Sequence, residues 1–452
     1  MQIIKNYQSK NTQRRSFIVK KRFAALLFGL MISYLYLPRD FFGTLHQETH
    51  MEFEDYVRYY KYPIQRHEVA TPDGYILTVF RIQAKYQKEF KQGLPVVYLQ
   101  HGLLDSSDSF IVNQESKAPA FMLANRGYDV WLGNFRGNKH SRSHVILNPE
   151  SPNKEEVRRF WNFSFHEMGV IDIPSIFEYI HNFTDRKINF IGHSQGSMSM
   201  FVALTEEHPV VKAYINQFIA LGPIAYIQHV TSIPLQLYNF ARQFIDLTQL
   251  LYKIEFYEFI PSTWFTTEVV SRFCNVFPLA CSYAYGLVGS IDPMLDQNDR
   301  YDVISAHIPS GTSLKNMMHF HQLISTYEFK RFDYGPEKNM KYYGQKTAPF
   351  YDLSKINIPV ALFLGTEDRL AVKEDVLRLK RELSNASELY FQEIHSGHTS
   401  FMWGKDMSYF EEVFNLLETH DFHDLNYYTQ STKLTSASQK NITNSSLTIE
   451  NQ

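Results

Sequence analysis

The residues most able to do chemistry stand in the pentapeptide 192–196, Gly-His-Ser-Gln-Gly. A short apolar run over 188–191 precedes it, and a stretch suited to a buried helix over 197–204 follows it. Gly-x-Ser-x-Gly between a strand and a helix is typical of a nucleophile elbow, in which the glycines allow a turn tight enough to raise the serine hydroxyl above the sheet. The bare pattern arises often by chance. The flanking runs therefore support the prediction that Ser194 is a nucleophile.

A serine nucleophile needs an oxyanion hole, which is usually built from two preorganised backbone N–H groups. One N–H is expected from Gln195, directly after the nucleophile. The other is expected from Leu103 in the loop His-Gly-Leu-Leu (101–104), where Gly102 lets the backbone approach the substrate. We interpret His101 as a structural residue rather than a catalytic one.

In this arrangement an acid and then a base follow the serine along the chain. Asp368 comes just after an apolar run, but its neighbour Glu367 has the same spacing and is an open alternative for the acid. The base could be His395 or His398, and His398 is better placed because it lies deeper in its loop, ahead of an apolar helix start. The base would accept the serine proton and later protonate the leaving group, while the acid orients the imidazole.

Metal and cofactor chemistry find no support in the sequence. The histidines are scattered, and neither His-Glu-x-x-His nor paired-cysteine spacing occurs, so we predict no metal site. No glycine-rich phosphate loop follows the first strand, so we predict no dinucleotide and no other cofactor. The 452 residues carry a net charge of −2, which gives no indication of a nucleic-acid partner. The oligomeric state stays unknown from the sequence.

The elements that must position these residues form an alternating pattern. A hairpin is expected over 67–82, around the turn Pro-Asp-Gly at 72–74. The apolar runs that each lead into a polar loop are 95–100, 128–132, 188–191, 360–364 and 389–394. Strands alternating with helices indicate a mostly parallel α/β sheet, with function at the carboxyl ends of its strands. Between about 222 and 351 the strand-like runs vanish, and aromatic-rich stretches over 235–259 and 269–288 predict an inserted helical cap.

The N-terminus predicts entry into the secretory pathway. Basic residues precede an apolar run over 23–37, which is typical of a secretory signal or an uncleaved signal-anchor. As a helix the run would span roughly 22 Å, short of a hydrocarbon core of about 30 Å. No clear cleavage site follows it, so cleavage and anchoring are both open. The predicted parts are the N-terminal region 1–45, the first core part 46–222, the cap or lid 223–351, the second core part 352–425 and a polar disordered tail 426–452.

Two further features agree with an oxidising, glycosylating compartment. Five Asn-x-Ser/Thr triplets are candidates for N-glycosylation: Asn162, Asn182, Asn385, Asn441 and Asn444. The two cysteines, Cys274 and Cys281, could pair across a short local loop or lie as two buried thiols.

From about Tyr59 to His420 the sequence resembles the acid lipase family, which contains the gastric and lysosomal acid lipases. The resemblance rests on an ordered series of segments: 68–82, 99–104, 132–138 (Leu-Gly-Asn-Phe-Arg-Gly-Asn), 160–169 (Phe-Trp-Asn-Phe-Ser-Phe-His-Glu-Met-Gly), 192–196, 309–313 (Pro-Ser-Gly-Thr-Ser) and 316–317. It implies an α/β-hydrolase fold with a cap and lid, hydrolysis of neutral lipid esters such as triacylglycerols and cholesteryl esters at a lipid/water interface, and a lysosomal or secreted location. A membrane-anchored enzyme with a lumenal or extracellular catalytic domain is the alternative.

Carried over by matching motif, the resemblance implies the nucleophile Ser194, the acid Asp368, the base His398 and the oxyanion donors Leu103 and Gln195. It favours His398 because Phe401 and Trp403 stand three and five residues beyond it, as in the family, whereas His395 does not align. A short-chain or retinyl-ester hydrolase and a catalytically silent lipid-binding protein on the same fold are the alternatives.

The sequence departs from the family pattern at three places. Thr399 and Ser400 follow the base where family members usually have Leu-Asp. Phe135 replaces a small residue, and a cap cysteine is absent near 269–270, which leaves the disulfide open. We expect these departures to affect local packing and substrate shape more than the catalytic residues.

Overall fold

The structure, a computed structural model, describes residues 43–241 and 247–420. Residues 1–42 of the expected N-terminal region 1–45, the candidate glycosylation residues Asn441 and Asn444, and the expected tail 426–452 lie outside the described residues. Within the described ranges, no helix is long and apolar enough to cross a membrane.

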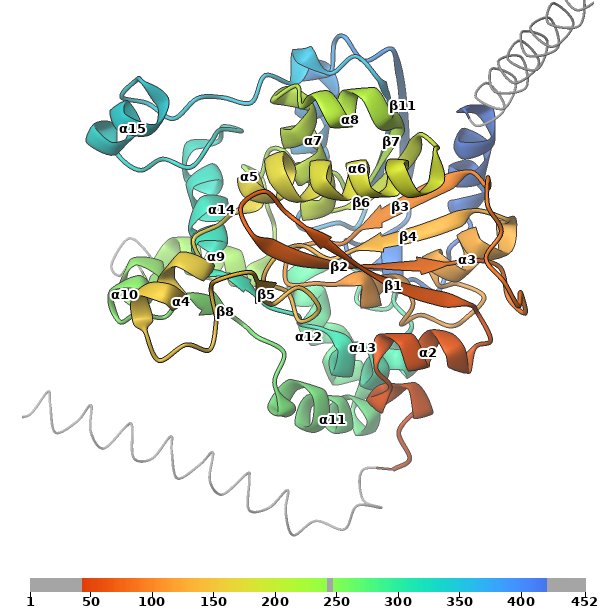
Figure 1. Cartoon of the computed structure of the whole chain (residues 1–452). Coiled ribbons are helices and arrows are strands. Elements are labelled where there is room, and N and C mark those ends of the chain that lie inside the picture. Colours follow the sequence, from red (N-terminus) through yellow and green to blue (C-terminus); the bar gives the residue numbers. More distant parts are fainter. Residues whose placement is uncertain (1–42, 242–246, 421–452) are drawn as a thin grey trace, which may run out of the picture. The chain divides into compact units, whose positions relative to one another are not determined.

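A nine-stranded, mostly parallel sheet organises the unit that begins at His46 (Figure 1). Its order is β1-β2-β4-β3-β6-β7-β10-β11, with β5 paired to β2. The pairs β1–β2, β2–β4 and β2–β5 are antiparallel, and the others are parallel. The strands are β1 (Ile64–Ala70), β2 (Tyr75–Ile82), β3 (Val96–Gln100), β4 (Asp129–Gly133), β5 (Ser143–His144), β6 (Ile188–His193), β7 (Ile215–Leu221), β10 (Pro359–Gly365) and β11 (Glu388–Ile394). The predicted fold class is thereby confirmed.

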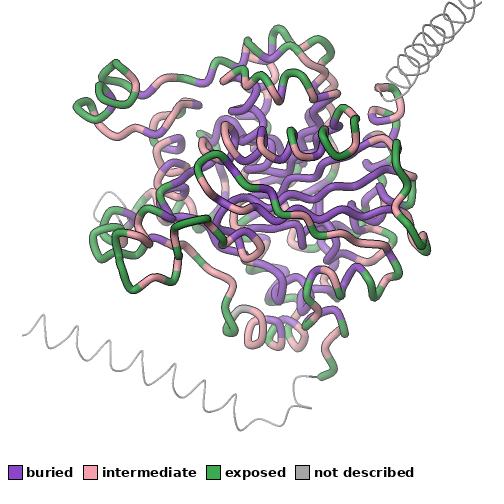
Figure 2. The backbone as a smooth tube through the Cα atoms, viewed as in Figure 1, coloured by how far each residue is buried: buried purple, intermediate pink, exposed green. Residues whose placement is uncertain are grey.

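Both faces of the sheet are covered, which explains why its central strands read as continuous apolar runs. In β3 every residue is buried: Val96 and Tyr98 belong to the core on one face, and Val97 and Leu99 belong to the core on the other. Figure 2 shows the central strands as buried. The helices of the core are η2 (Gln47–His50), α2 (Phe53–Tyr59), η3 (Ser107–Phe110), α3 (Pro119–Arg126), α4 (Lys154–Phe160), α5 (Phe165–Glu167), η4 (Met168–Asp172), α6 (Ile173–Thr184), α7 (Gln195–Thr205), α8 (Pro209–Tyr214), η7 (Leu353–Lys355), α16 (Lys373–Glu382), α17 (Ser400–Trp403) and 410–420.

Residues 223–351, here called the insertion, lie between β7 and β10 and are mainly helical where described. Its elements are α9 (Ile233–Ala241), α10 (Leu247–Lys253), β8 (Glu258–Phe259), η5 (Phe265–Val270), α11 (Ser271–Val276), α12 (Pro278–Gly289), η6 (Asn298–Arg300), α13 (Tyr301–His307), β9 (Thr312–Ser313), α14 (Leu314–Thr326) and α15 (Pro336–Tyr343).

Two expectations for the insertion differ from the structure. In the stretch expected to be helical over 235–259, the described helices are α9 and α10, and α10 ends at Lys253. The strand β8 then pairs with β9 in a two-residue ladder too short to give an alternating pattern. The helix expected over 269–288 breaks at Phe277 because Pro278 disfavours the helical conformation in the residue before it. A disulfide joins Cys274 to Cys281 across this break.

A buried ion pair fastens the loop after β4 to both neighbouring elements. Arg136 is almost fully buried, and its guanidinium bonds Asp172, at the start of α6, at 2.8 Å through Nε. Its Nη1 also bonds Asp73 in the β1–β2 turn at 2.6 Å. The side chain lies over the ring of Tyr75, with 4.1 Å between the guanidinium carbon and the ring centroid. One cation thus joins two loops and the start of α6.

Asp172→Asn should lower the free energy of unfolding by about 3–5 kcal/mol, because it leaves the buried Arg136 charge without one of its carboxylates. Urea unfolding followed by circular dichroism measures the change. The control is Glu155→Gln, which removes one carboxylate of the exposed pair Arg158–Glu155 and should leave the curve in place. Equal stability of the two variants would contradict the role given to Arg136.

Candidate active site

Ser194 stands at a strained turn between β6 and α7. Its φ of 53° and ψ of −117° lie outside the regions that non-glycine residues usually adopt. Two glycines make the turn possible: a Cβ on Gly196 would lie 2.3 Å from the carbonyl oxygen of Gln100, and one on Gly192 would lie 2.8 Å from the backbone of Gly196. The Ser194 N–H donates to the carbonyl of Leu221 in β7 at 3.0 Å. This is the geometry of a nucleophile elbow.

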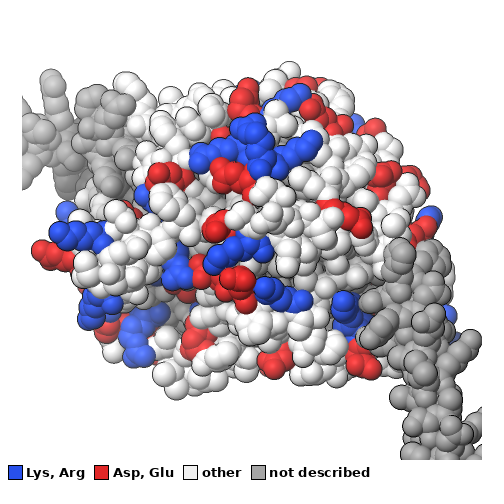
Figure 3. Space-filling view, turned by 90° about the horizontal axis from the view of Figure 1, so that it is seen from above, with Lys and Arg blue, Asp and Glu red and all other residues white. Residues whose placement is uncertain are grey.

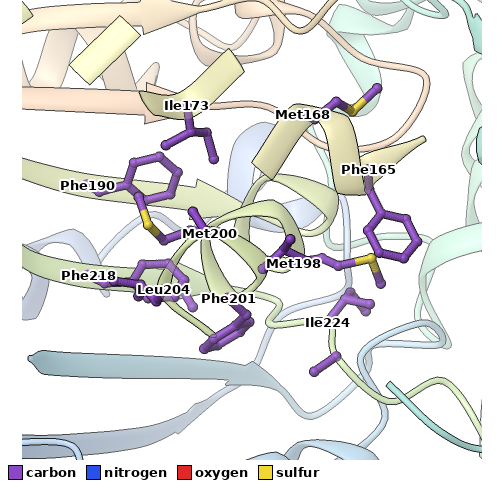
Figure 4. Close-up of a cluster of buried hydrophobic side chains, with 14 of the residues drawn as sticks. Phe165, Met168, Ile173, Phe190, Met198, Met200, Phe201, Leu204, Phe218 and Ile224 are labelled. Atoms are coloured by element: carbon purple, nitrogen blue, oxygen red, sulfur yellow. The ribbon is translucent and has the colours of Figure 1, made fainter. Parts of the chain in front are cut away.

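The helix behind the serine is buried on all sides. Every residue of α7 is buried, the polar Ser197, Ser199 and Thr205 included. Figure 4 shows its side chains among residues from β6, β7, α6 and the segment 165–168; the labelled residues are Phe165, Met168, Ile173, Phe190, Met198, Met200, Phe201, Leu204, Phe218 and Ile224. A helix packed in this way gives Ser194 a rigid support.

Asp368 and His398 meet beyond the ends of β10 and β11. His398 Nδ1 lies 2.8 Å from Asp368 Oδ2, and both side chains are buried. The other oxygen, Oδ1, accepts the N–H groups of Leu370 and Ala371 at 2.7 and 2.9 Å. A carboxylate held on both oxygens can fix the imidazole with its Nδ1–H toward the acid, which leaves Nε2 free to take a proton.

The alternative acid and base are more accessible to solvent. His395 Nδ1 and Glu367 Oε1 lie 3.9 Å apart, and their side chains are 69% and 25% exposed. The structure therefore brings Asp368 and His398 into the interior and leaves His395 at the surface and Glu367 partly exposed.

His193, which the sequence analysis does not single out, links the base to the elbow. Its Nε2 donates to the carbonyl oxygen of His398 at 2.9 Å, and the two rings lie 4.9 Å apart. Burial, aided by the neighbouring His398, lowers the pKa of His193 to about 3, so this ring stays neutral. The only sequence signal was its position directly before Ser194.

Gln195 is the first of the two expected oxyanion donors. It is the first residue of α7, where N–H groups have no carbonyl partner within the helix. Its side chain is tied to the insertion, because Asn316 Nδ2 donates to Gln195 Oε1 at 2.7 Å. The backbone at this position is therefore held from both sides.

His101 orients the second expected donor. Its Nε2 accepts the Phe135 N–H at 3.1 Å, so the ring proton lies on Nδ1, which donates to the Gly102 carbonyl at 2.8 Å. In a trans peptide the carbonyl and the next N–H point in opposite directions, so this bond turns the Leu103 N–H away from His101. Burial lowers the pKa of His101 to about 4 and keeps the ring neutral. These contacts agree with a structural role for His101.

Gly222 is a further residue that the sequence analysis missed. It follows β7 with a φ of 54°, and its N–H donates to the Phe363 carbonyl at 3.0 Å. A Cβ here would lie 3.2 Å from His398 Nδ1 and 3.3 Å from Asp368 Oδ2. A glycine is needed for the backbone conformation and for the space beside the acid–base pair.

The candidate glycosylation residues within the described ranges lie at the surface. Asn162, Asn182 and Asn385 are exposed. Among residues 43–241 and 247–420, no group of three or more His, Cys, Asp or Glu side chains could hold a metal ion.

Comparison with known proteins gives consistent matches along most of the chain. Residues 95–405 match a family described as "alpha/beta hydrolase fold", and residues 53–114 match a "Partial alpha/beta-hydrolase lipase region". Gastric triacylglycerol lipase of Rattus norvegicus is 39% identical over 403 residues, covering 86% of this chain and 97% of that protein. The Homo sapiens protein of that name is 36% identical over 403 residues, covering 86% and 96%. Lipase member K of Mus musculus is 35% identical over 367 residues, covering 79% and 88%.

Asp368→Asn should slow the reaction of Ser194 with an active-serine phosphonate by about 10³–10⁴-fold, because the amide no longer holds the imidazole in the required tautomer. The labelling rate is measured by intact mass spectrometry. Glu367→Gln is the matched control and should label at nearly the wild-type rate. A larger loss of labelling rate in Glu367→Gln would assign the role of the acid to Glu367.

Gly222→Ala should lower the same labelling rate by at least about tenfold, since the added methyl crowds the acid–base pair and the backbone is strained at a positive φ. Gly127→Ala supplies the control. Gly127 also has a positive φ, but its added Cβ would meet no atom within 4 Å. Equal labelling in the two variants would exclude a crowding effect at Gly222.

Proposed function

The chain belongs to the acid lipase family of α/β hydrolases, and from this premise we propose that it hydrolyses neutral lipid esters through an acyl-enzyme formed on Ser194. The chain is a carboxylic ester hydrolase of the lipase type, as its similarity to gastric triacylglycerol lipases over most of its length indicates. The substrates proposed are triacylglycerols, cholesteryl esters or both. The observation that supports the catalytic assignment most directly is the buried 2.8 Å contact between His398 and Asp368, near the strained serine turn.

The proposed reaction has two halves. Ser194 Oγ attacks the ester carbonyl while His398 accepts its proton, and the N–H groups of Leu103 and Gln195 stabilise the oxyanion. His398 then protonates the departing alcohol, leaving the acyl group on Ser194. A water molecule activated by His398 hydrolyses this acyl-enzyme, and the released serine regains its proton. Asp368 stabilises the charged imidazole in both halves.

The surface of the insertion favours contact with lipid. Large apolar side chains are exposed along it: Leu237, Phe240, Leu250, Ile254, Phe256, Trp264, Phe265, Phe273, Phe277, Leu279, Tyr283 and Ile291. Exposed apolar groups this numerous in one segment indicate an interaction site rather than ordinary surface variation. Figure 3 shows the face seen from above in Figure 1, where acidic and basic side chains are interspersed. We therefore propose that the insertion is a cap that covers an acyl-binding cleft and meets the lipid/water interface.

A disulfide in the insertion and two exposed asparagines outside it favour a lumenal or secreted protein. A disulfide joins Cys274 and Cys281, and disulfides persist mainly in oxidising compartments. The exposed Asn182 and Asn385 are accessible acceptors for glycans. We propose a lysosomal or secreted location on these grounds.

Ser194→Ala should keep the wild-type melting temperature and lose hydrolysis of a fluorogenic long-chain fatty-acyl ester by about 10⁶-fold, because the nucleophile is removed. A panel of acyl chains from short to long, with a retinyl ester included, separates a lipase from the alternative esterases. Wild-type-like turnover in Ser194→Ala would overturn the mechanism. A wild-type protein that neither turns over esters nor reacts with a phosphonate would instead be a silent lipid-binding protein.

A further inference from the structure

A short segment of the insertion, residues 289–296, lies against both loops that hold the acid and the base. The Gly289 carbonyl accepts the His398 N–H at 3.0 Å and the Arg369 N–H at 3.2 Å. Ile291 N–H donates to the Glu367 carbonyl at 2.8 Å, and Ser290 forms a β-bridge with Asp368. The acid and base loops are therefore braced from the insertion as well as from the sheet.

This segment ends in a buried carboxylate that faces the residues after the base. Asp296 Oδ2 accepts the Thr399 hydroxyl at 2.8 Å, and Asp296 Oδ1 accepts the Ser400 hydroxyl at 2.5 Å. Asp296 is only 4% exposed, and its backbone forms a β-bridge with Gly404. The Tyr301 hydroxyl lies 3.4 Å from Oδ2. Both carboxylate oxygens are therefore occupied by groups from the base loop.

The base loop over 395–400 carries these two hydroxyls directly after His398 and has no carboxylate of its own. A carboxylate from the insertion occupies the neighbouring space instead. We propose that Asp296 is a positioning residue for His398. Its carboxylate accepts hydrogen bonds from the side chains of the two residues after the base and thereby couples the position of the imidazole to the insertion. This inference rests on the proposed catalytic role of His398.

The physical effect follows from the anchors of His398. Its imidazole is held by Asp368, its carbonyl by His193 and its N–H by Gly289. The side chains of the next two residues, Thr399 and Ser400, both bond the Asp296 carboxylate, and such charge-assisted hydrogen bonds are stronger than bonds between neutral groups. Without the carboxylate, the buried Ser400 hydroxyl and the partly buried Thr399 hydroxyl lose this acceptor, and the start of the segment after the base can reorient. Such a change misplaces the base for the transition state without altering how the acyl chain binds.

Asp296→Asn is the first test, measured with a soluble fluorogenic acyl ester. We expect kcat to fall by about tenfold or more with KM unchanged, since hydrogen bonds to a charged group are lost. Active-serine titration corrects for unfolded protein, and the melting temperature is recorded. The matched control is Asp299→Asn, three residues along, where the carboxylate is exposed. A kcat for Asp296→Asn equal to that of Asp299→Asn would overturn the proposal.

Moving the carboxylate from position 296 to position 400 in the base loop provides a rescue experiment. Ser400→Asp alone should lower kcat and the melting temperature, because it buries two carboxylates side by side. The double variant Asp296→Asn with Ser400→Asp should recover most of the lost kcat, since one carboxylate is again present at this contact. Failure of the double variant to exceed both single variants would also overturn the proposal, and this comparison stays decisive if Asp296→Asn folds poorly. An inactive wild-type protein that phosphonate does not label would instead reject the proposed function.

Discussion

The backbone strain at Ser194 is the constraint on which the rest of the site depends. A non-glycine residue in this conformation costs on the order of 1–3 kcal/mol and persists only where its surroundings hold it. Here the close approach of Gly196 to Gln100, the buried helix α7 and the hydrogen bond to Leu221 hold it together. Because β3, β6 and β7 are neighbouring parallel strands, these contacts all lie at their carboxyl ends. The same register places the loop after Gln100, with its proposed oxyanion donor, beside the nucleophile.

The acid and base are held differently, because their loops depend on both the sheet and the insertion. β10 and β11 run in parallel register from Pro359 paired with Glu388 to Gly365 paired with Ile394, so their loops begin side by side. Beyond the strands, His398 is bonded by His193 of the elbow and by Gly289 of the insertion. Any displacement of 289–296 is therefore transmitted to both loops. If the proposed roles of Asp368 and His398 hold, these few backbone contacts link catalysis to the position of the insertion.

Features that depend on residues adjacent in the sequence could be predicted, and features that depend on contacts between distant residues could not. The elbow, the strand runs and the parallel α/β class depend on local apolar patterns, and the structure has strands at each expected run. Glu367 and Asp368 have the same spacing, and which of them faces inward is decided by a turn at Gly365, where a Cβ would lie 2.3 Å from the Ser396 carbonyl. Gly222 lacks a local signature, because a lone glycine after a strand is common. The helix break before Pro278 was indicated by the proline itself, and the prediction of one helix over 269–288 did not take it into account.

The residues after the base show why a departure from a family pattern is hard to interpret from one sequence. Thr399 and Ser400 suggest a change in local packing when they are compared with Leu-Asp alone. Asp296, more than a hundred residues earlier, supplies the carboxylate that these hydroxyls bond, so the polar contact depends on a residue distant in the sequence. A buried carboxylate is costly unless its oxygens are satisfied, and two hydroxyls are poorly placed in a buried loop without an acceptor. The hydroxyls therefore offset the cost of burying the Asp296 carboxylate, and the carboxylate supplies the acceptor that the hydroxyls need. Neither partner would be stable at this position beside the base without the other.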